Sequence, residues 1–347
     1  MCGIVGYFRK ASGEGPLGEV VLRMLSALGC RGPDSTGVAL YGGRREQGTV
    51  VRIKLVEDEP PKPQTAALLR AQESIAERTQ TLVSLGHADH GAAEVGLSQL
   101  RLGRSLLQAV TDADWIIEAT PEDLVSKQRV LEQVEQVSRL KSVLACNSGL
   151  LPSMLCGRLR RPERMLVIRP LNPVELLPAV EVIPSTLTDF SCVEDVRFWL
   201  TGLGRVVIVL KKEIPGGVIG RISAAVWREA IHLVLEGVVD VVDVDTAVEM
   251  GPCLGWAAAG PHLSCHLNAN ERGVSVFLAS LLPTYENWWQ HLASWHSLNG
   301  EDQLKLVKAI EKAYGAQLPQ LRAARDIRLA RLLNALSEEE VSSDGTP

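Results

Sequence analysis

Short apolar runs alternate with amphipathic stretches over the middle of the chain. Buried strands are expected at five of these runs, 114–119, 142–146, 165–170, 180–183 and 205–210. Helices are expected where apolar residues recur every three or four positions, at 106–113, 122–140, 151–159 and around 193–203. Strands that alternate with helices are typical of a doubly wound sheet, so the pattern predicts an α/β domain with a mostly parallel sheet.

The pattern changes after Pro215. No further strands are expected beyond this point, and helical periodicity continues at 219–238, 244–260, 273–281 and 302–334. Residues 213–335 are therefore predicted to form an all-helical C-terminal domain. Residues 336–347 are polar and acidic and are expected to form a flexible tail.

The N-terminal segment, residues 1–60, has a different pattern. Up to residue 50 it reads as strand, glycine-rich loop, helix, turn and strand, and the charged, proline-rich stretch 56–64 predicts a linker. Helical periodicity then runs from Thr65 to about Gly86. The α/β domain is expected to span residues 61–212, with an N-terminal part that is atypical or incomplete.

Composition and charge narrow the possible partners and the location. Apolar residues make up 46% and charged residues 22% of the chain, which predicts a packed globule. The net charge of -5 and the lack of a basic run argue against nucleic acid or an anionic membrane as a partner. Seven scattered cysteines without a CxxC pair fit a reducing compartment. No apolar stretch approaches the ~18 residues of a membrane span, so we expect a cytoplasmic protein. No metal site is expected, because His87 and His90 have no third ligand nearby in the sequence.

Seven segments of the chain carry a family resemblance. In chain order they are DADWIIEATPEDLVSK, NSGLLPS, RPERMLVIRPLNP, LLPAVEVIPS, KKEIPGGVIGRISAAVWREAIHLVLEGV, DVDTAV and GPCLGWAAAGP. Their order and spacing resemble the 3-hydroxyacyl-CoA dehydrogenase family, in the branch that includes carnitine and gulonate dehydrogenases, over about residues 66–335. The resemblance implies a Rossmann-like domain that binds NAD, and a homodimer formed through the helical domain. It also implies NAD-dependent oxidation of the secondary hydroxyl of a 3-hydroxyacyl or 3-hydroxy acid substrate, CoA-linked or free, and a role in fatty acid metabolism.

The same resemblance assigns roles to individual residues. The family's serine falls on Ser148 and its asparagine on Asn172, and both hold the substrate oxygen and the nicotinamide. The glutamate that orients the catalytic histidine falls on Glu181. The glutamate and lysine on the nucleotide side fall on Glu122 and Lys127.

Two positions depart from the family's pattern. Arg169 stands where the family has its catalytic histidine, and Gly220 stands where it has an asparagine. Arginine cannot act as a base near pH 7, because its pKa exceeds ~12 and it offers no lone pair. General acid–base catalysis is typically worth ~10²–10⁴ in rate, so the departure predicts an impaired dehydrogenase. An ion pair with Glu181, or a clamp for a carboxylate, is the expected role of Arg169.

A literal GxGxxG match occurs early in the chain. Its glycines are Gly13, Gly15 and Gly18. The preceding YFRKAS is too polar to end a buried strand, and Pro16 lacks the N–H that would face a phosphate. A surface turn is therefore favoured here over a dinucleotide site.

The opening stretch resembles a different family. MCGIVGYF and CRGPDSTGVALYGG resemble the start of class II glutamine amidotransferases, in which an N-terminal cysteine hydrolyses glutamine. Cys2 would be the nucleophile, and its own α-amine, of pKa ~8, would take the thiol proton. A small buried hydrophobe is the simpler reading of Cys2. Because this resemblance covers only about residues 1–60, the chain reads as a fusion of two truncated families.

Three functions stay open from the sequence. They are an NAD-dependent oxidoreductase, a glutaminase that uses Cys2, and a dimeric scaffold without activity. Some residues also have a simpler structural role. His87 and His90 are expected in a solvated loop, and Ser148 would suit the cap of a helix. Trp288 and Trp289 are expected to pack the helical domain or a dimer interface.

Overall fold

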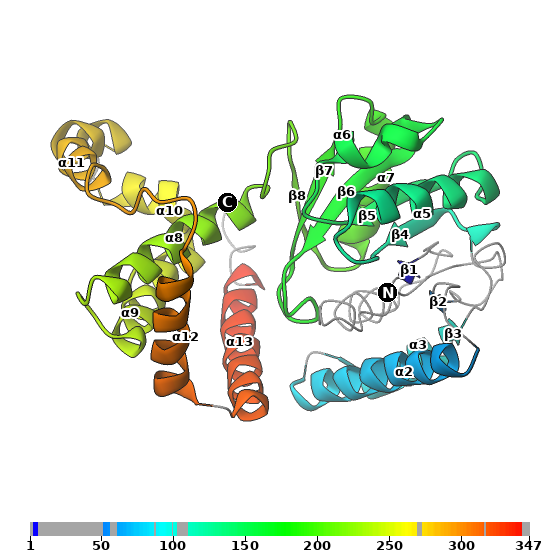
Figure 1. Ribbon diagram of the computed structural model, residues 1–347, viewed down its shortest axis with the longest axis horizontal. Coiled ribbons are helices and arrows are strands. Elements are labelled where there is room, and N and C mark those ends of the chain that lie inside the picture. Colours follow the sequence, from blue (N-terminus) through cyan, green and yellow to red (C-terminus); the bar gives the residue numbers. More distant parts are fainter. Residues whose placement is uncertain are drawn as a thin grey trace. The chain divides into compact units, whose positions relative to one another are not determined.

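The computed structural model divides into two compact units, Met1–Ile219 and Gly220–Pro347 (Figure 1). It describes residues 3–5, 51–55, 61–86, 88–98, 100–102, 110–268, 273–315 and 317–341. Each unit is considered by itself below.

The first unit contains one sheet of eight described strands, in the order β3-β2-β1-β4-β5-β6-β7-β8. The strands are β1 (Gly3–Val5), β2 (Val51–Leu55), β3 (Leu100–Leu102), β4 (Trp115–Glu118), β5 (Val143–Asn147), β6 (Met165–Pro170), β7 (Ala179–Pro184) and β8 (Val206–Val209). The ladders β2–β3, β4–β5, β5–β6 and β7–β8 are parallel, whereas β1 is antiparallel to both of its neighbours and β7 is antiparallel to β6. The predicted Rossmann-like, mostly parallel sheet with an atypical N-terminal part is confirmed.

Helices cover this sheet because its central strands are apolar on both faces. The helices of the first unit are α2 (Pro61–Ser84), α3 (His90–Ser98), α5 (Leu124–Val137), α6 (Pro152–Leu155) and α7 (Phe190–Gly202). All four residues of β4 are buried, and α5 contacts β4 while α7 contacts β7 and β8. Trp115 of β4 stacks on Trp199 of α7 with ring centroids 5.2 Å apart, which ties the sheet to its covering helix.

The sequence leaves open whether residues 1–60 complete the sheet of the α/β domain. Two described strands of this segment do so, since β1 and β2 lie in the same sheet as β4. Helix α2 differs from the expected elements, because it begins at Pro61, inside the stretch 56–64 expected to be a linker. Proline is well suited to the first turn of a helix, where no N–H is needed.

The second unit consists of helices in its described part, as the periodicity predicts. They are α8 (Ile219–Leu235, which begins at the last residue of the first unit), α9 (Val241–Val248), a π-helical turn (Glu249–Cys253), α10 (Leu254–Leu267), α11 (Val274–Trp289), α12 (Gly300–Tyr314) and α13 (Leu318–Val341). Helix α13 continues to Val341, into the segment expected to be a tail. Among the residues that the structure describes, no helix combines the length and the apolar character needed to cross a membrane.

Candidate functional site

The candidate site lies where β4, β5 and β6 end at one edge of the sheet. These strands run parallel, with Glu118 paired to Cys146 and Asn147 paired to Ile168. Their carboxyl ends therefore meet at the same edge, which is where open α/β sheets bind ligands. Glu122, Ser148 and Asn172, all predicted from the sequence, follow these three strand ends.

Glu122 fixes the turn that follows β5. Its Oε1 accepts hydrogen bonds from Ser148 Oγ at 2.8 Å, from Leu150 N at 3.0 Å, and from Gly149 N. Ser148 Oγ in turn accepts from Leu150 N at 3.0 Å, and Ser148 is only 1% exposed. The Ser148 hydroxyl therefore holds this turn, and it does not cap α6, whose first turn has no side-chain cap.

Lys127 lies in a buried polar cluster that contacts this turn through Glu122 and the carbonyl oxygen of Asn147. Its Nζ lies 3.0 Å from Glu118 Oε2, 3.2 Å from the carbonyl oxygen of Asn147 and 3.9 Å from Glu122 Oε2. The Lys127 side chain has no exposed surface. Burial alone lowers the pKa of Lys127, but the carboxylates of Glu118 and Glu122 and the polar Cys146 sulfur outweigh burial and raise it. Lys127 therefore stays charged, and it reaches the edge of the sheet through Glu122.

Cys146 completes the same cluster. Burial raises the pKa of the Cys146 thiol well above its usual value, and the nearby Glu118 carboxylate adds to the effect. The protonated thiol donates to Glu118 Oε2 at 2.6 Å. Cys146 is thus a structural donor and not a nucleophile.

Arg169 and Glu181 face each other across β6 and β7. They are register partners, and Arg169 Nη1 lies 3.7 Å from Glu181 Oε2. Glu181 is 2% exposed at its side chain and Arg169 is 25% exposed. The other carboxylate oxygen, Glu181 Oε1, accepts from Val218 N at 2.6 Å and from Ile219 N at 2.8 Å. Glu181 thus caps the start of α8, where a negative charge is favoured by the free N–H groups.

Gly217 allows this approach. Its φ is +60°, and a Cβ at this position would lie 2.8 Å from Arg169 Nη1 and closer still to Glu181 Oε2. Only glycine combines the positive φ with the missing side chain. The Gly216–Gly217 pair just before the predicted helix is the sequence signal of this turn. For Glu118, the signal is a charged residue that ends an apolar strand.

The remaining predicted site residues are placed as follows. Asn172 is exposed and follows the end of β6, and Gly220 is the second residue of α8. Cys2 and the glycines Gly13, Gly15 and Gly18 lie outside the described residues, as does His87. His90 pairs with Glu94 at 3.7 Å, and no group of potential metal ligands occurs in the described ranges.

The carboxyl edge carries one buried polar group that a dinucleotide could satisfy. Thr120 follows β4, between Glu118 and Glu122, and its buried hydroxyl has no hydrogen-bond partner among the residues that the structure describes. A buried hydroxyl without a partner costs about 1–3 kcal/mol, which a polar group of a ligand would offset. Together with the ordered turn at Ser148, this edge fits the nicotinamide side of NAD.

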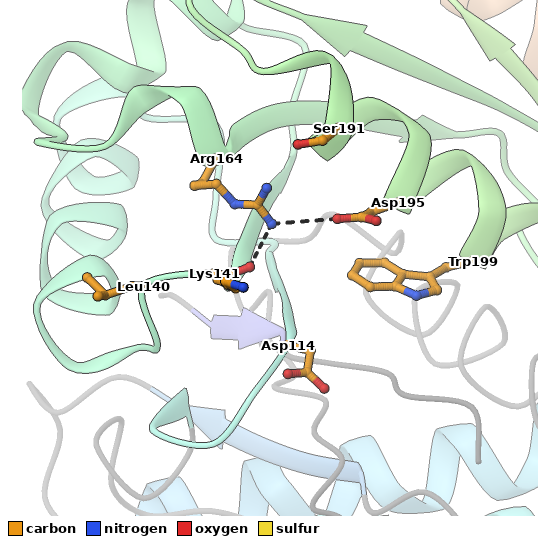
Figure 2. Close-up of a pocket in the computed structure, with 7 residues that line it drawn as sticks. All are labelled: Asp114, Leu140, Lys141, Arg164, Ser191, Asp195 and Trp199. Atoms are coloured by element: carbon orange, nitrogen blue, oxygen red, sulfur yellow. Dashed lines mark hydrogen bonds and ion pairs between the residues drawn. The ribbon is translucent and has the colours of Figure 1, made fainter. Parts of the chain in front are cut away.

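A cavity of about 490 Å³ lies at the opposite edge of the sheet, where the strands begin. Figure 2 shows the residues that line it, which are Asp114, Leu140, Lys141, Arg164, Ser191, Asp195 and Trp199. Arg164 donates to the carbonyl oxygen of Lys141 at 2.6 Å and lies 3.7 Å from Asp195. Arg164 thereby links the start of β5 to α7, a structural role that the sequence did not suggest.

Comparison with known proteins identifies the family. Residues 51–214 match the NAD binding domain of 3-hydroxyacyl-CoA dehydrogenase, and residues 216–308 match its C-terminal domain. The L-carnitine dehydrogenase of Bacillus cereus is 33% identical over 278 residues, which are 80% of this chain and 84% of that protein. The chain belongs to the 3-hydroxyacyl-CoA dehydrogenase family. It is accordingly an NAD-dependent oxidoreductase of this family, and NAD is its cofactor.

Other relatives agree with this assignment. The L-carnitine dehydrogenase of Nocardiopsis dassonvillei is 33% identical over 281 residues, covering 81% of this chain and 84% of that protein. Among solved structures, an NAD-dependent dismutase, 5-formyl-3-hydroxy-2-methylpyridine 4-carboxylic acid 5-dehydrogenase, has the same fold. Its TM-score is 0.69 at 24% identity, with 94% of this chain and 96% of that chain covered. None of these matches supports the amidotransferase resemblance of residues 1–60.

Proposed function

We propose that the chain interconverts a 3-hydroxy acid, or the corresponding 3-hydroxyacyl group, and its 3-keto form. The observation that carries this proposal is the row of Ser148 after β5, Arg169 near the end of β6 and Glu181 in the first half of β7, which runs antiparallel to β6. Asn147 pairs with Ile168, and Arg169 pairs with Glu181, so the three residues follow one another across neighbouring strands. When bound, NAD accepts the hydride from the carbon that bears the hydroxyl.

The residues of the carboxyl edge have distinct roles in this proposal. In this proposal, Glu122 and the Thr120 hydroxyl hold the nicotinamide side of NAD, which is supported by the order of the turn at Glu122 and by the missing partner of that hydroxyl among the described residues. Lys127 acts through Glu122, because Lys127 itself has no exposed surface. Ser148 keeps the turn after β5 in place, and the exposed Asn172 is free to contact nicotinamide or substrate.

Arg169 sets the proton chemistry of the reaction. A guanidinium stays protonated throughout the accessible pH range and cannot take the hydroxyl proton. It can stabilise the oxygen after the proton has left, as a fixed positive charge does for any developing oxyanion. The proton then passes to water, which favours oxidation at alkaline pH and reduction of the keto form near neutral pH.

The relatives support one substrate class for the site at the carboxyl edge of the sheet. The compared L-carnitine dehydrogenases act on a 3-hydroxy acid, which supports a small 3-hydroxy acid as the substrate of this chain. A CoA-linked 3-hydroxyacyl group of fatty acid metabolism is the alternative within the same family.

We further propose that the chain is a cytoplasmic homodimer that associates through its helical unit. Trp288 and Trp289 of α11 are 53% and 56% exposed and form an aromatic cluster with Tyr285. Exposed aromatic rings that lie together are typical of interfaces.

Gly220, at the start of α8, leaves the place of the family's asparagine without a side chain.

The test is a titration of the purified full chain with NADH, followed by turnover assays. Binding is read from NADH fluorescence and from thermal stabilisation, which is worth ~2.7 kcal/mol at hundredfold excess over the dissociation constant. Saturable binding with reduction of short 3-keto acids is the expected result. Saturable binding without turnover of any 3-hydroxy or 3-keto compound would contradict the proposal and favour a scaffold.

A further inference from the structure

The guanidinium of Arg169 has donors that the protein does not use. Its nearest carboxylate oxygen, Glu181 Oε2, lies 3.7 Å away, beyond hydrogen-bond distance. Within the described part of the chain, Arg169 has no hydrogen bond, and a quarter of its side chain is exposed. An arginine has five N–H donors in a planar fork that suits a carboxylate.

Glu181 needs little from Arg169. Both backbone amides at the start of α8, those of Val218 and Ile219, already donate to its Oε1. The positive end of the α8 dipole adds to their effect. The ion pair therefore places Arg169 without consuming its hydrogen-bonding capacity.

The segment between β8 and Gly217 contains two basic residues. Lys211 and Lys212 follow β8 and are exposed. The acidic residue of that segment, Glu213, accepts a hydrogen bond from Ser153 N at 2.9 Å. The carboxylates of Glu181 and Glu213 are thus both engaged by backbone amides.

We propose that Arg169 binds the free carboxylate of the substrate with two of its five N–H donors and keeps the others for the reacting oxygen, so that the site selects 3-hydroxy and 3-keto acids over their thioesters. This inference rests on the proposed function and names the substrate class of the same site. A thioester carbonyl carries no charge, so its hydrogen bond with Arg169 is charged on the donor side only. A carboxylate adds the opposite charge and accepts a bidentate pair of N–H···O bonds from the planar guanidinium.

The test compares acetoacetate with its uncharged methyl ester as ligands of the NADH-loaded full chain. Binding is measured by calorimetry, so that turnover is not needed for the readout. We expect the wild-type chain to bind the acid at least about tenfold more tightly than the ester. Arg169→Gln should remove this preference by weakening the acid alone. Arg169→Lys should restore part of it, because lysine keeps the charge but lacks the fork.

Arg158→Gln is the matched control, since it removes one cation of the same unit that is paired at 3.9 Å with Glu132. It should leave the acid-to-ester ratio unchanged. Equal binding of acid and ester, or an unchanged ratio in Arg169→Gln, would overturn the inference. A loss of NADH affinity in Arg169→Gln with the ratio unchanged would assign the guanidinium to the cofactor instead, and would overturn it equally.

Failure of the proposed function gives a different result. If NADH does not bind, the proposed function falls, and the acid and ester are titrated without cofactor. The ratio and its loss in Arg169→Gln then still decide whether Arg169 recognises a carboxylate.

Discussion

Lys127 and Glu118 form an ion pair that water does not reach. Their side chains are 0% and 1% exposed, and Nζ lies 3.0 Å from Oε2. Removing one partner of such a pair leaves a buried charge, whereas removing both does not. The pair therefore links the stability of the first unit to the order of the turn at its candidate site.

Lys127→Met should lower the free energy of unfolding by about 3–5 kcal/mol, because Glu118 would stay buried without a cation. The measurement is urea unfolding followed by tryptophan fluorescence. The double variant Lys127→Met with Glu118→Leu should recover most of the loss. A single variant as stable as the wild type would show that the cluster takes up water or a proton at little cost.

Glu122→Gln should weaken NADH binding about tenfold, because a neutral amide cannot accept three hydrogen bonds on one oxygen as well as a carboxylate does. Fluorescence titration with NADH measures the effect. The control is Glu132→Gln on α5, the helix that follows Glu122, where the carboxylate is 41% exposed and lies 3.9 Å from Arg158. The two variants should differ clearly, and equal affinities would remove Glu122 from the cofactor site.

Arg169→His should raise the rate of alcohol oxidation at saturating substrate by ~10²–10⁴, because an imidazole can take the hydroxyl proton and Glu181 is in place to orient it. The pH profile is the diagnostic. In the wild-type chain the rate should keep rising toward alkaline pH, whereas the variant should level off above the histidine pKa of ~6.5. A folded variant that binds NADH but shows neither change would mean that the site has not kept the geometry of a histidine–glutamate pair.

Tyr314 should ionise late in an alkaline titration. The hydrogen bond to Asp245, burial, and the charges of Asp245 and Glu249 raise the pKa of Tyr314 to about 12. Because the folded pKa lies above the unfolded value of ~10, the contact stabilises the helical unit fully below about pH 10 and is lost between about pH 10 and 12. Absorbance near ~295 nm follows the phenolates. Tyr314→Phe should remove the last phase, and Asp245→Asn should move it to lower pH.

Trp288→Asp should convert the proposed dimer to monomer. A carboxylate in the aromatic cluster with Tyr285 would have to be desolvated in any interface built there, which is costly. Light scattering after size exclusion, at several protein concentrations, reads the mass directly. Phe198→Asp is the matched change in the first unit, where Phe198 is 71% exposed. A monomeric wild type, or a dimer that survives Trp288→Asp, would exclude this surface.

The sequence pattern predicts where Ser148 and Arg169 lie, because each stands at the end of a short apolar run and parallel strands bring these ends to one edge. Their roles come from the family resemblance alone and stay predictions. The burial of Lys127 could not be predicted in this way. Its partners Glu118 and Cys146 are 9 and 19 positions away, and nothing in a helical pattern shows that they close over the amine.

The direction of β1 is a second feature that no sequence pattern contains. Three apolar residues, Gly3–Val5, would suit a strand in either orientation. Their pairing with β2 and β4 involves residues some 50 and 110 positions later, and such distant pairing is set by the assembled sheet. The family resemblance does not predict the direction of β1 either, because it covers only about residues 66–335.

The tolerance of Gly217 to substitution is a poor guide to its role in catalysis. Asparagine, which tolerates a positive φ, is excluded by the space beside Arg169, and alanine, the smallest alternative, is disfavoured by the φ of +60°. No conservative replacement exists, so a survey of all substitutions would mark the position as intolerant. It would rank with the catalytic residues, although glycine offers a substrate nothing to bind. The intolerance would come from the Arg169–Glu181 ion pair, which lies against Gly217.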